Sequence, residues 1–360
     1  MQGHERHRPD PSGHDIIVIG ASAGGVEALG ILVEALPADL DAAIFVVLHV
    51  PPNGFSALPA ILSRRGPLQA LHPVHGEPIQ RGRIYVAPPD HHLLLRDGGG
   101  VGHIHLARGP RENGHRPAVD VLFRSAAAMY GPRVAGVVLS GALDDGTAGL
   151  VAVTQLGGSA LVQDPAEALA QGMPRSAAQH VPDAEVLPLA DLADAIVRLT
   201  KEPPPGQPGD VPRDLTVENK MGALGMDVLH ADDRPGEPSG FSCPDCGGVL
   251  WEIKDSAVTR FRCRVGHAWS SESLIEQQFQ ALETSLWVAL RSLEERSALS
   301  HRLRDRSLAR RHSVSAERFK EQAEDAERAA EQIRAFLLGR TGSEHRDAAP
   351  SPEPTATENG

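Results

Sequence analysis

The feature that most constrains this chain is a repeated alternation of short apolar runs with helical segments between residues 15 and 200. The runs are IIVIG (16–20), AIFVVLHV (43–50), RIYVAP (83–88), VAGVVLSG (134–141) and SALVQD (159–164). The intervening segments include GGVEALGILVEAL (24–36) and PAVDVLFRSAAAM (117–129). Strands that are apolar throughout are buried on both faces, and strands that alternate with helices form parallel sheets. The sequence therefore predicts a doubly wound, mostly parallel α/β sheet.

One segment interrupts this alternation. HLLLRDGGGVGHIHLA (92–107) carries two apolar runs on either side of a glycine cluster, which predicts an antiparallel hairpin. The whole chain has 360 residues of which 41% are hydrophobic, enough for a sizeable core.

Composition also excludes several classes of protein. No apolar run approaches the roughly 18 residues of a membrane span, so no membrane insertion is expected. The first residues are polar and lack the apolar region of a signal peptide, and we expect a cytoplasmic protein. A formal charge of -12 argues against broad nucleic-acid binding, which needs a basic surface.

Changes in composition divide the chain into segments. We expect a disordered tail at 1–14, a catalytic domain at 15–202, a Pro/Gly-rich linker at 203–240, a zinc-ribbon-like module at 241–270, an amphipathic helical hairpin or coiled coil at 271–340, and a disordered tail at 341–360. The helical prediction rests on apolar residues spaced three and four apart. These helices either pack on each other or offer a seam to a second subunit or to receptor helices.

The stretch GASAG (20–24) lies between the first predicted strand and the first helix. A dinucleotide fingerprint needs a second glycine where this chain has Ser22, and an acidic residue where the next strand ends in His49. The same letters satisfy Gly-x-Ser-x-Gly, the elbow that presents a serine nucleophile above the carboxyl edge of a sheet. Ser22 is therefore either a nucleophile or the cap of the helix that begins near Gly24.

Polar residues also follow two other predicted strands. His49 ends one of them, and Asp144 and Asp145 follow another. Side chains at the carboxyl ends of the strands of an open α/β sheet converge in space. A serine hydroxyl needs an imidazole to remove its proton, and a carboxylate fixes the tautomer of that imidazole. The joint placement favours a Ser-His-Asp triad over separate structural roles, with either aspartate open as its acid.

Six motifs follow one another along residues 17–174 in the order found in a known protein family. They are IVIGASAGG, VLHVPPNGF, GRIYVAPPDHHLL, RPAVDVLF, GVVLSGALDDGTAGL and QDPAEALAQGMP. Together they resemble the catalytic domain of the bacterial chemotaxis methylesterases, the CheB family. The resemblance implies hydrolysis of glutamate methyl esters on the cytoplasmic helices of chemoreceptors, with release of methanol, and deamidation of glutamine. It places the catalytic serine on Ser22, the histidine on His49 and the aspartate on Asp145.

The chain departs from this family at two places in the site. Ala23 follows the serine where the family often has threonine, and Ala142 opens the Ala-Leu-Asp run where the family has Met-Gly-Asn. Backbone N–H groups do not depend on the side chain, so those of Ala23 and Ala142 are candidate donors of an oxyanion hole. The family usually has an N-terminal receiver domain, and we expect none from the residues before Asp15. Phosphorylation control in cis is then not expected.

The cysteines form a metal-binding pattern of their own. The chain reads Cys-x2-Cys, a spacer of sixteen residues, and Cys-x3-His, with the ligands Cys243, Cys246, Cys263 and His267. This is the ligand count and spacing of a closed tetrahedral zinc site, and we expect a structural zinc and no catalytic cofactor. Gly247 and Gly248 would form the turn, and VLWEI (249–253) and RFRC (260–263) the strands. The alternative is three reduced cysteines and a surface histidine.

Two classes of function follow for the whole chain. The first is an active methylesterase with an accessory zinc-and-helix module, and the second is a regulatory interaction protein whose serine site is idle. The presence of all three triad residue types favours the enzyme. The expected partners are methyl-accepting chemoreceptors or similar signalling proteins, and a second copy through the C-terminal helices. Residues 241–340 either restrict access and select the receptor, or only dimerise and add stability.

Overall fold

The computed structural model describes residues 13–54, 56–98, 102–204, 206, 209–223, 236–253 and 258–341. It divides the chain into two compact units, 1–275 and 276–360. The tails expected to be disordered lie outside the described residues at 1–12 and 342–360. His14, which the sequence assigned to the first tail, is buried, and its backbone amide donates a hydrogen bond to the carbonyl of Leu199 at 2.9 Å.

The first unit is built on a seven-stranded sheet in the order β3-β4-β2-β1-β7-β8-β9. All of its strand pairs are parallel, which confirms the predicted doubly wound architecture. The strands are β1 (Ile16–Ala21), β2 (Ala43–Leu48), β3 (Gln69–Leu71), β4 (Arg83–Val86), β7 (Val134–Val138), β8 (Ser159–Gln163) and β9 (Glu185–Leu187). The edge strands β3 and β9 have three residues each, too few to give a sequence signal.

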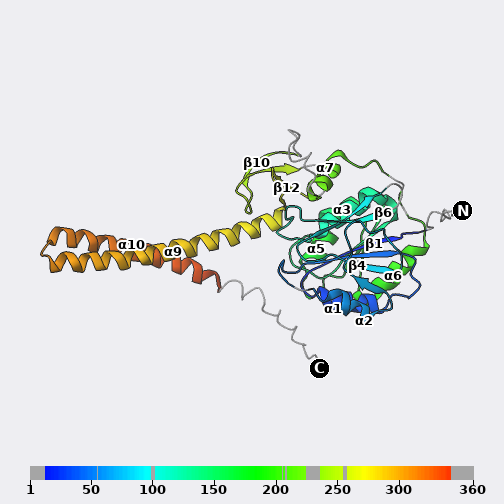
Figure 1. Ribbon diagram of the computed structural model, residues 1–360, viewed down its shortest axis with the longest axis horizontal. Coiled ribbons are helices and arrows are strands. Elements are labelled where there is room, and N and C mark those ends of the chain that lie inside the picture. Colours follow the sequence, from blue (N-terminus) through cyan, green and yellow to red (C-terminus); the bar gives the residue numbers. More distant parts are fainter. Residues whose placement is uncertain are drawn as a thin grey trace, which may run out of the picture. The chain divides into compact units, whose positions relative to one another are not determined.

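Helices cover both faces of this sheet (Figure 1). One face carries α1 (Gly25–Glu34), α2 (Leu58–Arg65) and α6 (Leu189–Lys201), and the other carries α3 (Val119–Tyr130), α4 (Thr147–Gln155) and α5 (Gly172–His180). Alternate residues of β1 enter the two cores, because Ile17 and Ile19 pack with the first group and Ile16 and Val18 with the second. A 3-10 turn, η1 (Gly131–Arg133), leads from α3 into β7.

The predicted antiparallel hairpin is also present. It consists of β5 (His92–Asp97) and β6 (Gly102–Ala107), which pair in antiparallel register. Leu93, Leu95 and Ile104 from this hairpin are buried in the same core as α3. The hairpin thus extends the core on the α3 side of the sheet.

The interval 203–240, expected as a linker, contains a helix. α7 (Arg213–Gly222) buries Leu215 and Met221, and the Asn219 side-chain amide donates to the carbonyl of Arg124 in α3 at 3.2 Å. The prolines and glycines that predicted a linker flank this helix rather than interrupt it. α7 therefore packs on the domain that precedes it in the chain.

A small four-stranded antiparallel sheet completes the first unit. Its strands are β10 (Glu237–Ser242), β11 (Val249–Ile253), β12 (Arg260–Cys263) and β13 (Ala268–Ser270). Their own core consists of Cys243, Leu250, Phe261, Cys263, Trp269 and Leu274. We refer to residues 237–270 as the ribbon.

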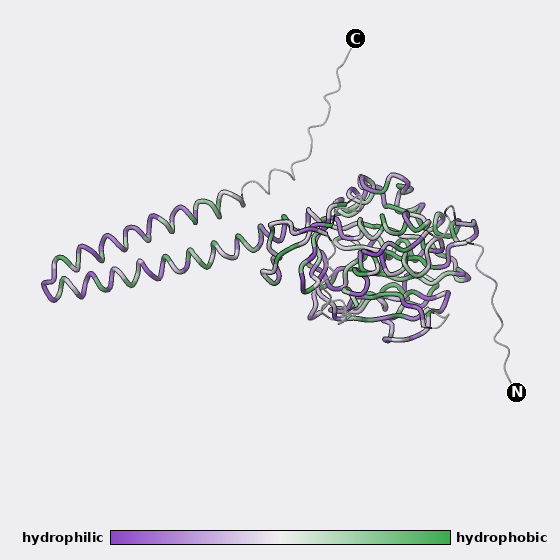
Figure 2. Tube along the Cα trace, turned by 90° about the horizontal axis from the view of Figure 1, so that it is seen from above, coloured by the Kyte–Doolittle hydropathy of each residue, from purple (hydrophilic) through white to green (hydrophobic). Residues whose placement is uncertain are grey.

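The second unit is a helical hairpin, as the spacing of apolar residues predicted. α9 (Ser271–Ala309) and α10 (Ser313–Thr341) pack through a seam that includes Leu290, Ala330 and Leu337. Figure 2 shows hydrophilic and hydrophobic residues alternating along both helices, whereas the sheet-containing unit gathers its hydrophobic residues inside. Among the described residues, no helix is both long and apolar enough to cross a membrane.

The two-sided burial of the sheet gives a first test on α1. Leu29→Ala is expected to lower the free energy of unfolding by about 2–5 kcal/mol, because Leu29 is fully buried and its loss leaves a cavity. Ile31→Ala on the same helix is the control, since Ile31 is 46% exposed and its change should cost less than about 0.5 kcal/mol. Denaturant unfolding followed by circular dichroism measures both, and equal losses would contradict this packing.

Candidate active site

The three residues predicted as a triad follow three strands that are neighbours in the sheet. Ser22 comes directly after β1, His49 directly after β2, and Asp145 lies in the turn between β7 and α4. The backbone amide of His49 donates to the carbonyl of Ala21 at 3.2 Å, which fixes these two strand ends side by side. β1 pairs with β2 on one side and with β7 on the other, so the ends of the three strands lie side by side at the edge where α/β sheets bind ligands. His49 and Asp145 are in direct contact, and no hydrogen bond joins the Ser22 side chain to either of them among the described residues.

Ser22 occupies a tight turn between β1 and α1. The left-handed backbone of this turn falls on Gly24, with φ of 76°, and not on the serine. A Cβ at Gly20 would lie 2.2 Å from a methyl group of Val119, and one at Gly25 would lie 2.7 Å from Ala21, so both positions need glycine. α1 has no side-chain cap, and the alternative that Ser22 caps this helix is therefore wrong.

Asp145 is hydrogen-bonded to the ring of His49 and to three further donors. Asp145 Oδ2 accepts hydrogen bonds from His49 Nε2 and from the backbone amide of Val119, both at 2.7 Å. Its Oδ1 accepts from Asn113 Nδ2 at 3.0 Å and from the amide of Asp120 at 3.2 Å. Two of these donors are the first amides of α3, so the carboxylate also lies at the positive end of a helix dipole.

These donors decide the charge of the pair. Burial alone would raise the pKa of Asp145, but the hydrogen bond and positive charge of His49 and the surrounding donors outweigh burial and hold this pKa well below its usual range. An ionised carboxylate can only accept, so His49 Nε2 is the donor in this bond, and in the neutral ring the lone pair is then on Nδ1. Nδ1 is buried and has no hydrogen-bond partner among the described residues. It is the nitrogen left to take a proton from a nucleophile.

The adjacent Asp144 has different contacts. Its Oδ1 accepts hydrogen bonds from the hydroxyl groups of Ser270 at 2.6 Å and Ser273 at 3.0 Å, and it makes no recorded contact with His49. Burial raises the pKa of Asp144 to about 6, although the two hydroxyl groups lower it. Of the two aspartates that the sequence left open, Asp145 is the one that orients the histidine.

Three residues of this site carried no signal in the sequence. Asn113 donates to both Asp145 and Asp120, and burial and the Asp145 charge raise the pKa of Asp120 to about 7. The His115 ring stacks on His49 with centroids 3.6 Å apart and planes 10° apart. Burial and the neighbouring His49 lower the pKa of His115 to about 4, so the stacked ring is neutral at pH 7. Asn113 and His115 precede α3 and Asp120 lies in its first turn, so only the clustering of polar residues around the start of this helix could have drawn notice.

An open pocket of about 300 Å³ lies beside His49. Its lining comprises His49, Val50, Pro51, Pro52, Arg111, Gly114, His115 and Arg116. Arg116 pairs with Asp90 at 2.5 Å, while Pro51 and Pro52 give the opposite wall a fixed backbone. The lining of this pocket therefore contains the His49 imidazole and the side chains of two arginines.

The proposed oxyanion donors lie at the same edge. Ala23 is exposed and follows Ser22, and Ala142 is exposed in the turn after β7. A Cβ added at Gly141 would lie 2.9 Å from the Ser22 Cβ, so this turn passes close to the serine. The roles of Ala23 and Ala142 stay predictions.

The four predicted metal ligands come together in the ribbon. The ligand atoms of Cys243, Cys246, Cys263 and His267 all lie within 4.8 Å of one another. Cys246 Sγ and Cys263 Sγ are 3.7 Å apart, and His267 Nδ1 lies 3.6 Å from Cys263 Sγ. A zinc ion with bonds of about 2.3 Å to sulfur and about 2.0 Å to nitrogen gives tetrahedral edges of about 3.5–3.8 Å. The donor set and its spacing fit such an ion.

Two glycines in the left-handed region form the turns next to these ligands. Gly247, with φ of 71°, follows the first cysteine pair, and Gly266, with φ of 106°, lies between Cys263 and His267. The amide of Gly247 donates to the carbonyl of Cys243 at 2.8 Å. The expected knuckle at Gly247 is thus present, and a second one at Gly266 mirrors it.

Comparisons with known proteins identify relatives of the sheet domain. The CheB methylesterase family matches residues 17–196. A protein of Methanosarcina mazei named protein-glutamate methylesterase/protein-glutamine glutaminase 2 is 36% identical over 198 residues, which cover 54% of this chain and 54% of that protein. A protein-glutamate methylesterase/protein-glutamine glutaminase of Nocardioides sp. is 40% identical over 199 residues, covering 55% and 54%.

A solved structure agrees with these relatives. The CheB methylesterase catalytic domain of Thermotoga maritima matches with a TM-score of 0.50 and 33% identity, and the match covers 52% of this chain and 98% of that domain. This chain spans about half the length of the curated relatives that it matches. The ribbon and the helical hairpin lie beyond the matched family region.

The burial of Asp144 predicts a pH-dependent effect on stability. Its folded pKa of about 6 lies above the unfolded value of about 3.9, so this group favours the folded state below about pH 4 and loses that contribution as the pH rises to 6. Asp144→Asn does not titrate, and it should gain about 1–3 kcal/mol relative to wild type between pH 4 and pH 7.5. Denaturant unfolding at both pH values measures this gain. The same pH dependence in both proteins would contradict the raised pKa.

Proposed function

Because the chain belongs to the CheB methylesterase family, we propose that it is a serine hydrolase that demethylates glutamate methyl esters, with Ser22, His49 and Asp145 as its catalytic triad. The observation that carries this proposal is the 2.7 Å hydrogen bond between His49 and Asp145 at the strand end next to Ser22. It holds the His49 ring by Nε2 and leaves Nδ1 as the base, which is the same division of roles as in a Ser-His-Asp triad with the two ring nitrogens exchanged.

The proposed reaction has two halves. Ser22 Oγ attacks the carbonyl carbon of the methyl ester while His49 Nδ1 accepts the hydroxyl proton. The C–O bond to the methoxy group then breaks, and His49 returns its proton to that oxygen, which releases methanol and leaves an acyl-serine. Water attacks the acyl carbon with the same proton relay, restoring Ser22 and freeing a glutamate carboxylate. With glutamine as substrate, ammonia replaces methanol as the first product.

The geometry of the free site is consistent with this sequence of steps. Within the described part of the chain His49 Nδ1 has no hydrogen-bond partner, so its lone pair is available to the serine proton. Hydrogen bonds between nucleophile and base often shorten only when substrate binds. We assign the developing oxyanion to the backbone amides of Ala23 and Ala142, because both residues are exposed beside Ser22 at the carboxyl edge of the sheet.

The pocket beside His49 suggests the class of substrate. Arg111 places positive charge in the lining of this pocket, whereas the charge of Arg116 is already paired with Asp90. Guanidinium groups attract carboxylates, so a segment rich in glutamate is favoured there. We propose the cytoplasmic helices of methyl-accepting chemoreceptors, or of similar signalling proteins, as that segment. The reaction then takes place in the cytoplasm and needs no catalytic cofactor.

For the ribbon we propose a structural zinc. All four ligands come from the protein, which leaves no open position for a catalytic water. His267 Nε2 lies 3.8 Å from an oxygen of Asp245, and a carboxylate in this position favours Nδ1 as the coordinating atom.

For the helical hairpin we propose contact with a second copy of the chain. Ile275, Phe279 and Leu282 on α9 lie four and three positions apart, and each is at least 45% exposed. Apolar side chains at helical spacing on one helix are typical of a seam between helices.

The triad assignment gives a direct test. Ser22→Ala should abolish methanol release from a methylated receptor without unfolding the protein, because it removes only the attacking oxygen. Asp145→Asn should lower the rate by about 10⁴, since an asparagine can present the wrong partner to the His49 ring. Asp144→Asn is the matched control and should retain activity within a few fold. Wild-type release from Ser22→Ala, or a larger loss from Asp144→Asn than from Asp145→Asn, would contradict the assignment.

A further inference from the structure

The ribbon is attached to the loop that precedes α3. The backbone amide of Asn113 donates to the carbonyl of Ala268 at 2.8 Å, and the amide of Ala268 donates to the carbonyl of Arg111 at 3.2 Å. The amide of Ser270 donates to Asn113 Oδ1, also at 2.8 Å. Strand β13 thus fixes the backbone of this loop and one end of the Asn113 side chain.

The other end of the same side chain reaches the triad. Asn113 Nδ2 donates to Asp145 Oδ1 at 3.0 Å and to Asp120 Oδ2 at 3.1 Å. Asn113 is only 5% exposed, so water does not replace these donors readily. One buried amide therefore joins Ser270 of the ribbon to the carboxylate that orients His49.

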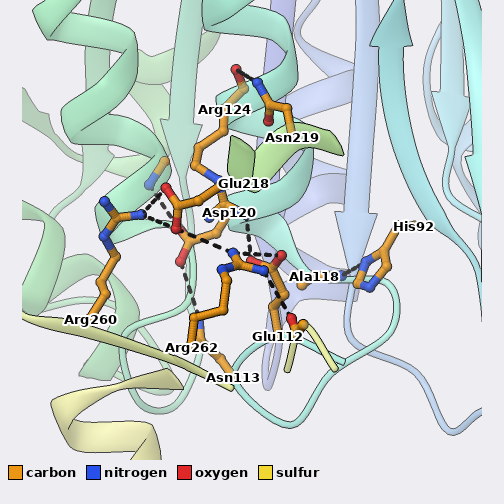
Figure 3. A network of polar contacts seen from close by, with 12 residues as sticks. His92, Glu112, Asn113, Ala118, Asp120, Arg124, Glu218, Asn219, Arg260 and Arg262 are labelled. Carbon is orange, nitrogen blue, oxygen red and sulfur yellow. Dashed lines mark hydrogen bonds and ion pairs between the residues drawn. The ribbon is translucent and has the colours of Figure 1, made fainter. Parts of the chain in front are cut away.

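A buried ionic network anchors the ribbon in this position (Figure 3). Arg262 of β12 pairs with Glu112 at 3.0 Å and with Glu218 of α7 at 3.2 Å, and all three side chains are 1% exposed. Burial alone would raise the pKa of Glu112, but the guanidinium groups of Arg124 and Arg262 outweigh it and hold this pKa below its usual range. Removing one member of such a network would leave an unpaired buried charge, which is strongly destabilising. The contact between the ribbon and the loop before α3 therefore has a defined geometry.

The ribbon in turn depends on its metal ligands. Two of the six residues of its core are the cysteines at 243 and 263, and His267 directly precedes Ala268, which bonds the loop. A sheet this small buries too little apolar surface to fold on its own, and metal binding is folding free energy in such modules. Loss of the metal would therefore weaken the ribbon next to the contact of β13 with Asn113.

We propose that Asn113 is a positioning residue for Asp145, and that the metal-loaded ribbon holds Asn113 in place, so that metal loss slows the hydrolytic site without touching the triad. The effect on rate rests on the proposed hydrolase and the effect of the metal on the proposed zinc, whereas the link from β13 through Asn113 to Asp145 rests on neither. The chemical requirement is a tetrahedral divalent cation such as zinc at the Cys3His group.

The first experiment tests the positioning role in the full chain. Asn113→Ala should lower kcat for a small methyl ester by about 10- to 100-fold with KM unchanged, the range seen when outer-shell partners of catalytic groups are removed. The downfield proton resonance of the His49–Asp145 hydrogen bond should broaden or shift in the same variant. Asn219→Ala is the control, because the Asn219 amide donates to the carbonyl of Arg124 and, among the described residues, makes no hydrogen bond to Asp145 or to the ribbon, so this change should alter neither quantity.

The second experiment tests the role of the metal. Cys246→Ser removes the exposed ligand, and it should lose bound zinc in elemental analysis and lower kcat by the same factor as Asn113→Ala. The double variant should show no further loss, because both changes break one coupled path. Val265→Ser, at an exposed position in the second knuckle, should keep metal and rate. Chelation of the wild-type protein, followed by return of zinc, should reproduce the loss and then the recovery.

The outcomes separate the two claims. A metal-free Cys246→Ser variant, or a chelated wild-type protein, with an unchanged resonance and unchanged kcat would overturn the coupling while leaving the esterase intact. Independent, multiplicative losses in the double variant would overturn the path through Asn113. If no variant and no wild-type sample hydrolyses esters, the proposed function fails, and the resonance alone then decides the coupling.

Discussion

The buried carboxylate of Asp145 is the interaction on which the rest of the site depends. It accepts from His49, from Asn113 and from the first two amides of α3, so one group fixes the catalytic ring, the entry of a helix and a loop. Asp120 of α3 has the corresponding role at α4, because its Oδ1 accepts hydrogen bonds from the amides of Gly146 and Gly149 at the start of that helix. Asp120 of α3 thus lies at the N-terminus of α4, and Asp145, in the turn before α4, lies at the N-terminus of α3. This exchange keeps two carboxylates buried side by side.

The topology of parallel sheets explains how much of the fold and of the candidate site could be predicted from the sequence. The apolar runs gave the order of strands and helices, and the rule that strand ends converge placed Ser22, His49 and an aspartate together. Adjacency could not choose between Asp144 and Asp145, because neighbours in a turn point in different directions. The family resemblance pointed to Asp145, and the amides of α3, which donate to Asp145, give the physical reason.

Long-range polar contacts account for what the sequence did not reveal. Asn113 and Ser270 are 157 positions apart, and Glu112 and Arg262 are 150 apart, with no periodic pattern linking them. α7 was hidden by the prolines and glycines around it, although it supplies Glu218 to the same network. The Cys3His group could be recognised in the sequence because zinc sites of this kind have a fixed spacing of ligands along the chain. That the ribbon also contacts the catalytic loop follows from tertiary structure alone.

The central claim is that Ser22 is a nucleophile activated by the His49–Asp145 pair. Its most direct test is to treat the full chain with a fluorophosphonate, which reacts with activated serine hydroxyls, and to locate the adduct by peptide mass spectrometry. We expect one adduct per chain, on the peptide that contains Ser22. No adduct, or an adduct on another serine with Ser22 unmodified, would contradict the claim.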